Sequence, residues 1–410
     1  MAKIRPFKAI RPTRDKANLV ASRSYLSYSD ESLKEKLDNN PFTFLHIINP
    51  DYNQKKKNNG IDKFDLVKGK FNTFVSDKTL FQEEKESIYI YQQIKEDVTF
   101  TGFIAATSVD DYLDGKIKIH EQTLTNREEM FKNYLQTTGF NAEPVLLTYS
   151  DNSVISGLIS EKIKNRAEYE FTTTNKVCHK LWVVNNSDEI KVMVSEFNKI
   201  NKIYIADGHH RSASSALLCQ NIRKENTEFN PEDNFNFFMS YFIEESQLRI
   251  INFNRLIKHT NGQTANELIY KIEGSYSVKK MGKEIYSPTL KNEISMYFGG
   301  NWYSLIAHSK KYNSTSESLD PSILSESILS PILGIADEKT DSNISFYDGT
   351  IPLDELRKKV DNQEYSIAFI LKPIDIESLK KVADNNEIMP PKSTYIEPKL
   401  RSGLTIYKLD

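Results

Sequence analysis

One stretch near the middle of the chain reads Ile203-Tyr-Ile-Ala-Asp-Gly-His-His-Arg-Ser-Ala-Ser-Ser-Ala-Leu-Leu218. Its first three residues are β-branched or aromatic, which predicts a strand, and its Ala-, Ser- and Leu-rich second half predicts a helix. Asp207 and Gly208 make the turn between the two elements. The first N–H groups of a helix have no acceptor within it, and the helix dipole is positive there. Such a junction therefore favours a bound phosphate or carboxylate.

Side chains with chemical functions are concentrated at this junction. Asp207, His209, His210 and Arg211 lie within five positions, and Gly208 stands among them. A guanidinium can bind the same anion through two parallel hydrogen bonds. An ordinary junction between strand and helix, with Asp207 as a capping residue, is the simpler interpretation. The two adjacent histidines and the arginine favour a binding site instead.

Composition limits the classes of protein to which this chain can belong. Its 410 residues are enough for two compact domains with hydrophobic cores. The 54 Lys and Arg against 56 Asp and Glu leave a net charge of −2, which argues against a basic face for nucleic acid. Cys178 and Cys219 lack the spacing of metal ligands and indicate reduced thiols. The N-terminus has no apolar signal segment and no apolar run approaches membrane-spanning length, so we expect a cytoplasmic protein without a membrane partner.

Predicted helices alternate with apolar strands, which indicates a mixed α/β or α+β fold. We expect Ser29 to cap a helix that runs through Leu37, and Gly139 to end a helix over 126–137. The apolar run 42–48 predicts a strand. The order of the elements suggests an N-terminal α/β segment over 1–85, a core over 86–258 that contains the Asp-Gly-His-His-Arg motif, and a C-terminal α+β region over 259–410.

Two further segments contain groups suited to a site. His120 and Glu121 follow a short predicted strand over 116–119, a common place for acids and bases, although exposed His-Glu pairs are also common. The C-terminal segment 389–407 contains three prolines, which predict an extended backbone. A row of hydrogen-bond donors lies along it: Lys392, Ser393, Thr394, Lys399 and Arg401. This segment either packs over an anion site or closes the fold as a strand with a solvated face.

Six motifs are spread along the chain: Pro6-Phe-Lys-Ala-Ile-Arg-Pro12, Gly115-Lys-Ile-Lys-Ile-His-Glu-Gln-Thr123, Leu181-Trp182, Ala206-Asp-Gly-His-His-Arg211, Pro331-Ile-Leu-Gly-Ile335, and Met389-Pro-Pro-Lys-Ser-Thr-Tyr395 with Pro398-Lys-Leu-Arg-Ser-Gly403. In this order they resemble the domain-of-unknown-function 1015 family of bacterial and archaeal cytoplasmic proteins. The likeness covers nearly the whole chain. Two positions depart from the family pattern. Ser22-Arg-Ser-Tyr25 replaces a usual Pro-Pro-Tyr-Asp, and Asn254 stands where many relatives have a histidine.

The resemblance implies a fold and a ligand. The Asp-Gly-His-His-Arg motif is similar to the nucleotide-contacting motif of the ParB/sulfiredoxin superfamily, in which partitioning proteins bind CTP, sulfiredoxin uses ATP and an archaeal free serine kinase uses ADP. It implies a ParB/sulfiredoxin-like nucleotide-binding core with the C-terminal α+β region packed on it. The serine kinase has the most similar motif. The implied ligands are therefore ATP or ADP, Mg²⁺, and a small hydroxy amino acid such as free serine.

The same resemblance assigns roles in phosphoryl transfer. This reaction needs positive charge around the transferred oxygens and an acceptor for the proton of the attacking hydroxyl. Backbone N–H groups over 207–212 would bind phosphates, Asp207 would cap the turn or help to hold Mg²⁺, and Glu121 would be the base. The other implied phosphate contacts are His120, His209, His210, Arg211, Lys392, Ser393, Thr394, Lys399 and Arg401.

Two other functions stay open. The chain could bind a nucleotide as a switch or sensor without turning over a small molecule, as ParB-like proteins suggest. The histidine pair with Asp207 and Glu121 could also form the transition-metal site of a phosphatase or another hydrolase, although adjacent histidines rarely face one ion. The nucleotide, the acceptor and the oligomeric state are also left open, a homodimer included.

Overall fold

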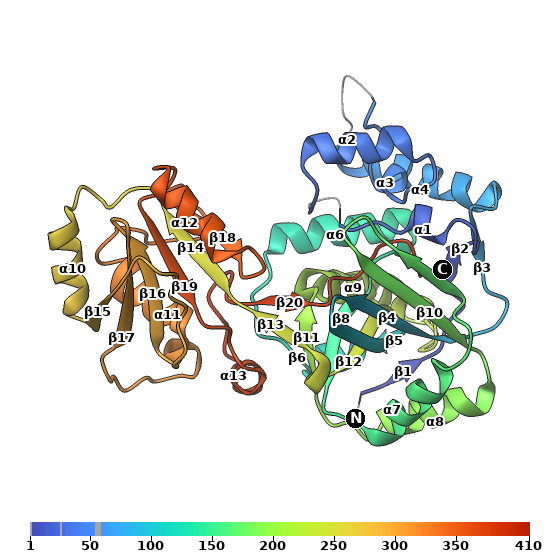
Figure 1. Ribbon diagram of the computed structural model, residues 1–410. Coiled ribbons are helices and arrows are strands. Elements are labelled where there is room, and N and C mark those ends of the chain that lie inside the picture. The colour runs from blue at the N-terminus through green and yellow to red at the C-terminus, as the bar shows by residue number, and fades with distance from the viewer. Residues whose placement is uncertain (1, 25–26, 54–58) are drawn as a thin grey trace. The chain divides into compact units, whose positions relative to one another are not determined.

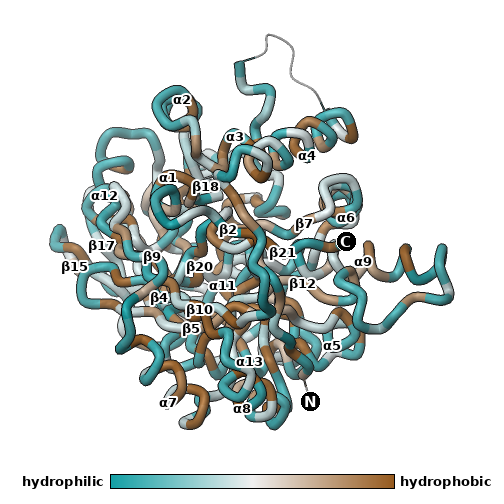
Figure 2. The backbone as a smooth tube through the Cα atoms, turned by 90° about the vertical axis from the view of Figure 1, so that its right-hand side faces the viewer, coloured by the Kyte–Doolittle hydropathy of each residue, from teal (hydrophilic) through white to brown (hydrophobic). Residues whose placement is uncertain are grey.

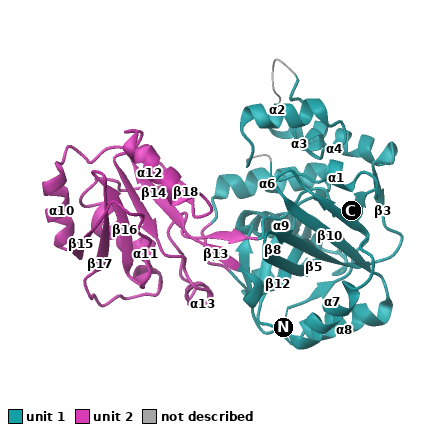
Figure 3. Ribbon diagram, in the orientation of Figure 1, with its two compact units in different colours: residues 1–118, 123–248, 398–410 teal, residues 119–122, 249–397 magenta. Residues whose placement is uncertain are grey.

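The computed structural model describes residues 2–24, 27–53 and 59–410, so that Tyr25 lies outside the described residues. The chain folds into two compact units (Figure 3). The first consists of residues 1–118, 123–248 and 398–410, and the second of 119–122 and 249–397. The mixed α/β architecture predicted from the sequence is confirmed. The division into three segments that the sequence suggested (1–85, 86–258 and 259–410) stays a prediction.

The first unit is built on a nine-stranded mixed sheet in the order β6-β11-β8-β12-β5-β4-β10-β9, with β1 beside β5 (Figure 1). Its strands are β1 (Ile4–Arg5), β4 (Ile88–Lys95), β5 (Val98–Ser108), β6 (Ile117–Lys118), β8 (Val145–Tyr149), β9 (Tyr169–Thr172), β10 (Val177–Val184), β11 (Ile203–Asp207) and β12 (Phe237–Glu244). The pairs β6/β11 and β8/β12 are parallel. The strand that leads into the motif, β11, lies between β6 and β8, and its Ile203 and Ile205 are buried.

Helices and short strands complete the first unit. They are α1 (Ala17–Val20), α2 (Asp30–Asn39), α3 (Leu45–Ile48), α4 (Gly60–Ser76), α5 (Val109–Leu113), α6 (Thr125–Thr138), α7 (Ser153–Lys162), α8 (Ser187–Phe197), α9 (His209–Glu225), β2 (Ile10–Pro12), β3 (Leu80–Gln82), β7 (Phe140–Asn141) and β21 (Tyr407–Lys408). Apolar residues of α7 and α8 pack on sheet residues such as Ile90, Phe103 and Leu147 in one core. Helix α2 is mostly hydrophilic (Figure 2) and buries Leu37.

Local signals set the ends of two helices as predicted. The Ser29 hydroxyl accepts a hydrogen bond of 3.2 Å from the Ser32 N–H, and α2 begins at the next residue, Asp30. Gly139 ends α6 with a φ of 77°, in the left-handed conformation that favours glycine. The predicted N-cap and the predicted helix stop are therefore both confirmed.

The strand predicted over 42–48 is wrong, because this run forms a turn and the short helix α3. Seven apolar-rich residues fit a buried strand and a buried helical turn equally well, so their pattern alone does not separate the two. The Asn40 side chain accepts a hydrogen bond from the Phe42 N–H and turns the chain. Phe44 and Ile47, three positions apart, then pack in a core with apolar residues of α4.

The second unit is built on a six-stranded antiparallel sheet in the order β15-β17-β16-β19-β14-β18. Its elements are β14 (Phe253–Ile257), α10 (Ala265–Glu273), β15 (Tyr276–Gly282), β16 (Glu293–Phe298), β17 (Asn301–Ala307), α11 (Asp320–Leu324), β18 (Ile344–Asp348), α12 (Leu353–Asp361), β19 (Ile367–Leu371) and α13 (Ile376–Asp384), with a ribbon of β13 (Arg249–Ile251) and β20 (Tyr395–Glu397). Leu256 and Ile257 belong to different apolar cores. Because successive strand residues point to opposite faces, these cores cover the two faces of the sheet.

Within the described residues, no helix combines the length and the apolar character needed to cross a membrane.

Candidate functional site

The junction of β11 and α9 has the predicted form of a strand, a glycine turn and a helix. β11 ends at Asp207 and α9 begins at His209, so Gly208 is the residue before the first helical turn. Its φ of 106° lies in the region that side chains disfavour, and a Cβ atom would come within 3.1 Å of the Arg211 guanidinium. Gly208 supplies no side-chain cap at the start of α9, and the first N–H groups of a helix have no acceptor within the helix.

Gly208→Ala should destabilise the protein by about 1–3 kcal/mol, because the new Cβ is strained at this φ and crowds Arg211. Urea unfolding followed by circular dichroism measures the change. Gly157→Ala is the matched control, because Gly157 lies in α7 with open space around it. That substitution should stabilise by about 0.5–1 kcal/mol. Equal stability of Gly208→Ala and the wild type would contradict the strained turn.

Asp207 lies between two cations. Its Oδ2 is 3.3 Å from Arg211 Nη2, and its Oδ1 is 3.6 Å from Lys399 Nζ. The backbone carbonyl of Lys399 accepts a 3.1 Å hydrogen bond from the Gln93 side chain, which holds the C-terminal segment in place. The carboxylate thus positions one cation from α9 and one from the C-terminal segment. The capping role predicted for Asp207 stays a prediction.

Arg211 has further partners that sequence reasoning missed. Its Nη1 donates to the backbone carbonyl of Pro144, and its Nη2 is 3.6 Å from Glu143 Oε1. Glu143 and Pro144 precede β8, the strand beside β11. No local pattern distinguishes these two residues, because they become neighbours of Arg211 only through the order of strands in the sheet.

The two histidines of the motif differ in their surroundings. His209 is buried at the first position of α9, whereas His210 is half-buried. Burial lowers the pKa of His210, Arg127 lowers it further, and Glu128 opposes this. Both charged residues belong to the first turns of α6, so His210 faces that helix. The imidazole of His210 is therefore neutral at pH 7, and it offers a hydrogen bond but no positive charge.

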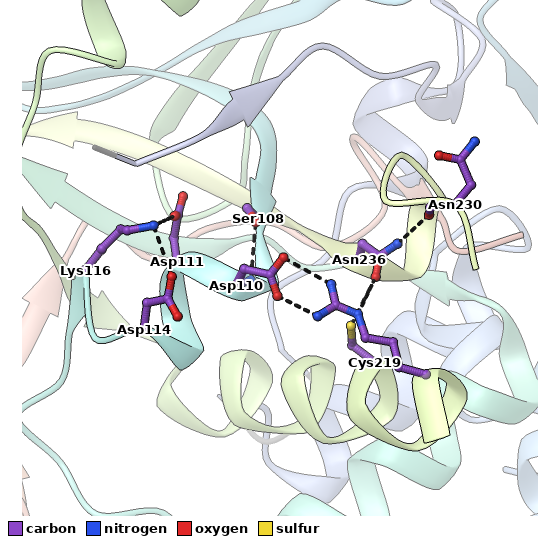
Figure 4. A network of polar contacts seen from close by, with 9 residues as sticks. Ser108, Asp110, Asp111, Asp114, Lys116, Cys219, Asn230 and Asn236 are labelled. Carbon is purple, nitrogen blue, oxygen red and sulfur yellow. Dashed lines mark hydrogen bonds and ion pairs between the residues drawn. The ribbon is translucent and has the colours of Figure 1, made fainter. Parts of the chain in front are cut away.

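The far half of α9 is fixed by a polar network (Figure 4). Arg223 donates to both oxygens of Asp110 at 2.6 and 3.2 Å, and its Nε donates to Asn236 Oδ1 at 2.9 Å. The thiol of Cys219 lies 3.4 Å from the same Asn236 oxygen. These contacts tie α9 to α5 and to the segment before β12. The C-terminal half of α9 is therefore fixed in place, and the first turn of the helix extends from this fixed part.

Cys219 should resist alkylation in the folded protein. The thiol is fully buried, and burial raises its pKa to about 11. Because the thiolate is the reactive form, Cys219 stays protonated and inert at about pH 8. Iodoacetamide labelling followed by peptide mass spectrometry should modify Cys219 only after unfolding in guanidinium chloride. The half-buried Cys178 is the internal comparison. Rapid labelling of Cys219 in the native state would contradict the burial of its thiol.

The other residues predicted for the site lie in different places. Arg401 belongs to the first unit, where it is buried and its Nη2 donates to Asn175 Oδ1 at 3.1 Å. Five residues lie in the second unit: His120, Glu121, Lys392, Ser393 and Thr394. Within that unit, the Met389 N–H donates to the His120 carbonyl at 2.9 Å, so the two predicted segments do meet. A single site that combines them with the motif stays a prediction.

The side chains at the motif do not fit a metal ion held by the protein. Mg²⁺ prefers carboxylate oxygens, but each oxygen of Asp207 already faces a cation. Across residues 2–24, 27–53 and 59–410, no three His, Cys, Asp or Glu side chains are grouped in a way that could hold a metal ion.

Comparison with known proteins gives the family. Residues 4–322 match the family described as Protein of unknown function (DUF1015). The chain belongs to this family. The sequence resemblance is thereby confirmed at family level, while the ParB/sulfiredoxin-like assignment stays a prediction. No curated protein matches the sequence significantly.

Several solved structures are similar in part. A free serine kinase in complex with AMP covers 75% of this chain and 91% of its own, at 12% identity and a TM-score of 0.38. A conserved hypothetical protein from Pyrococcus furiosus covers 77% and 97%, at 13% identity and a TM-score of 0.36. SbnI with a C-terminal truncation from Staphylococcus aureus covers 74% and 87%, at 14% identity and a TM-score of 0.37. TM-scores this low do not establish a common fold.

Proposed function

We propose that this protein is a nucleotide-binding phosphotransferase that uses ATP or ADP and acts on a small hydroxy amino acid such as free serine. The observation that supports this proposal is the first turn of α9. Gly208 leaves its N–H groups without a side-chain cap, and Arg211 and Lys399 lie on either side of Asp207. Backbone N–H groups together with two cations are the donors that nucleotide phosphates require.

The roles of the side chains follow from their charge and position. Arg211 binds a phosphate through its guanidinium, and Lys399 adds a second positive charge from the C-terminal segment. His209, at the first position of α9, donates to a phosphate oxygen. Asp207 holds the two cations apart before the nucleotide binds. A divalent cation would enter with the phosphates, because Asp207 is already paired.

Glu121 is proposed as the base that accepts the proton of the attacking hydroxyl, with His120 as a phosphate contact. Glu121 is half-buried, and the carbonyl of its neighbour His120 is tied to the Met389 N–H. A carboxylate on an anchored segment is suited to orienting a hydroxyl. Lys392, Ser393, Thr394 and Arg401 are proposed as further anion contacts.

Isothermal titration with ATP, ADP, CTP and GTP tests the first half of this proposal. Phosphorus NMR with L-serine present tests the second. A phosphomonoester signal that depends on serine supports the kinase. Binding without consumption of the nucleotide would instead indicate a sensor, and release of inorganic phosphate without serine would indicate a hydrolase. Absence of binding by all four nucleotides would overturn the proposal.

A further inference from the structure

Two arginines face each other in the first unit, across a short antiparallel bridge. The Ser22 N–H donates to the Ser402 carbonyl at 3.2 Å, and the Ser402 N–H donates to the Ser22 carbonyl at 2.9 Å. In this register the residue after Ser22 stands opposite the residue before Ser402. These residues are Arg23 and Arg401. Directly opposed residues in antiparallel pairs have Cβ atoms about 5 Å apart, and like charges there are destabilising.

The contacts of the two arginines are with neutral side chains. In the described part of the chain, no acidic side chain forms an ion pair with either guanidinium. Arg401 is only 8% exposed, and its Nη2 contacts the neutral side chains of Thr173 (3.4 Å) and Asn175 (3.1 Å). Arg23 lies with its guanidinium 4.8 Å from the centre of the Tyr28 ring. A desolvated cation without an acidic partner is costly, and a bound anion relieves that cost.

Neutral donors and acceptors line the region around Arg401. Burial and the charge of Arg401 lower the pKa of His179 to about 3, so its ring is neutral. The Nδ1 of His179 is 2.7 Å from the Tyr91 hydroxyl, and burial raises the pKa of that phenol, so it is not an anion either. His179 is 1% exposed, and its Nε2 has no hydrogen-bond partner among the described residues. A buried ring nitrogen without a partner, close to Arg401, points to a polar ligand there.

We propose that Arg23 and Arg401 bind the carboxylate of the small hydroxy amino acid that accepts the phosphoryl group. This inference rests on the proposed function. One residue separates Arg401 from Lys399, so their Cα atoms are at most about 7 Å apart. The carboxylate site at Arg401 and the cation assigned to the phosphates therefore belong to one short segment of backbone. A planar carboxylate also matches the paired N–H groups of a guanidinium.

The test is isothermal titration of the full-length protein with L-serine and L-homoserine, compared with their amides, in which the carboxylate is absent. The wild type should bind at least one amino acid and not its amide. Arg23→Gln should weaken that binding at least tenfold and leave ADP and ATP affinity unchanged. It should leave the melting temperature of the free protein equal or higher, because it removes the repulsion between the arginines. A purely structural Arg23 would lower the melting temperature.

Arg166→Gln is the matched control, because Arg166 is an exposed arginine of the same unit. It should change neither affinity. If the Arg401→Gln protein folds, it should show the same loss of amino acid affinity as Arg23→Gln. If it does not fold, the result for Arg23→Gln decides. Unchanged amino acid binding in Arg23→Gln overturns the inference, as does equal binding of the amides. If inorganic phosphate competes with amino acid binding and acetate does not, the inference is also overturned, and the site is a phosphate subsite.

The amino acids are titrated both with and without a nucleotide. Nucleotide binding without amino acid binding rejects this inference and leaves the nucleotide site intact. Amino acid binding that depends on Arg23, without any nucleotide binding, rejects the proposed function and retains the carboxylate site.

Discussion

Replacing Arg211 with alanine is expected to lower nucleotide affinity by about 10- to 100-fold. Hydrogen bonds to charged groups contribute about 1.5–3 kcal/mol, and each 1.4 kcal/mol is a factor of about ten in affinity. The guanidinium is held in place beforehand by Pro144 and Asp207, so little conformational freedom is lost when a phosphate binds. Its removal also leaves the negative charge of Asp207 beside the incoming phosphate. Isothermal titration with ADP and ATP measures the loss.

Arg223→Ala is the matched control for Arg211→Ala. Both arginines lie on α9 and pair with an aspartate, and they are about 18 Å apart along the helix axis. Arg223→Ala should destabilise the fold through the loss of its bonds to Asp110 and Asn236, but it should bind nucleotide as the wild type does. If both variants lose affinity equally, damage to the helix explains the effect, and the phosphate role of Arg211 is wrong.

Glu121→Gln is expected to lower the turnover number by about 10²- to 10⁴-fold while nucleotide affinity stays unchanged. Glutamine keeps the size of the side chain, but its amide does not accept the proton of an attacking hydroxyl. The measurement is the rate of serine-dependent phosphomonoester formation by phosphorus NMR, with a parallel nucleotide titration.

Glu129→Gln serves as the comparison for Glu121→Gln. Glu129 is an exposed residue of α6 that pairs with Lys132 at 2.9 Å. Glu129→Gln therefore removes one negative charge near Glu121 in the sequence and leaves Glu121 unchanged. It should retain full turnover. Equal turnover in Glu121→Gln and the wild type would show that Glu121 is not the base.

The junction at the start of α9 could be predicted from residues alone, because its signals are local. A β-branched and aromatic run makes the strand, a glycine permits the positive φ, and an Ala- and Ser-rich run makes the helix. The cap at Ser29 and the stop at Gly139 are local in the same sense. The run 42–48 lacks such a signal, and its packing against α4 decides in favour of a helix.

The partners of the motif depend on the order of strands, which no local pattern encodes. Arg211 meets Pro144, 67 residues earlier, because β8 lies beside β11. Lys399 reaches Asp207, and Arg401 comes to stand opposite Arg23, because the last residues return to the first unit. Sequence therefore specifies where an anion would meet a helix end, since that depends on neighbouring residues. Tertiary structure specifies which distant charges surround it, since those charges approach only when the sheet has formed.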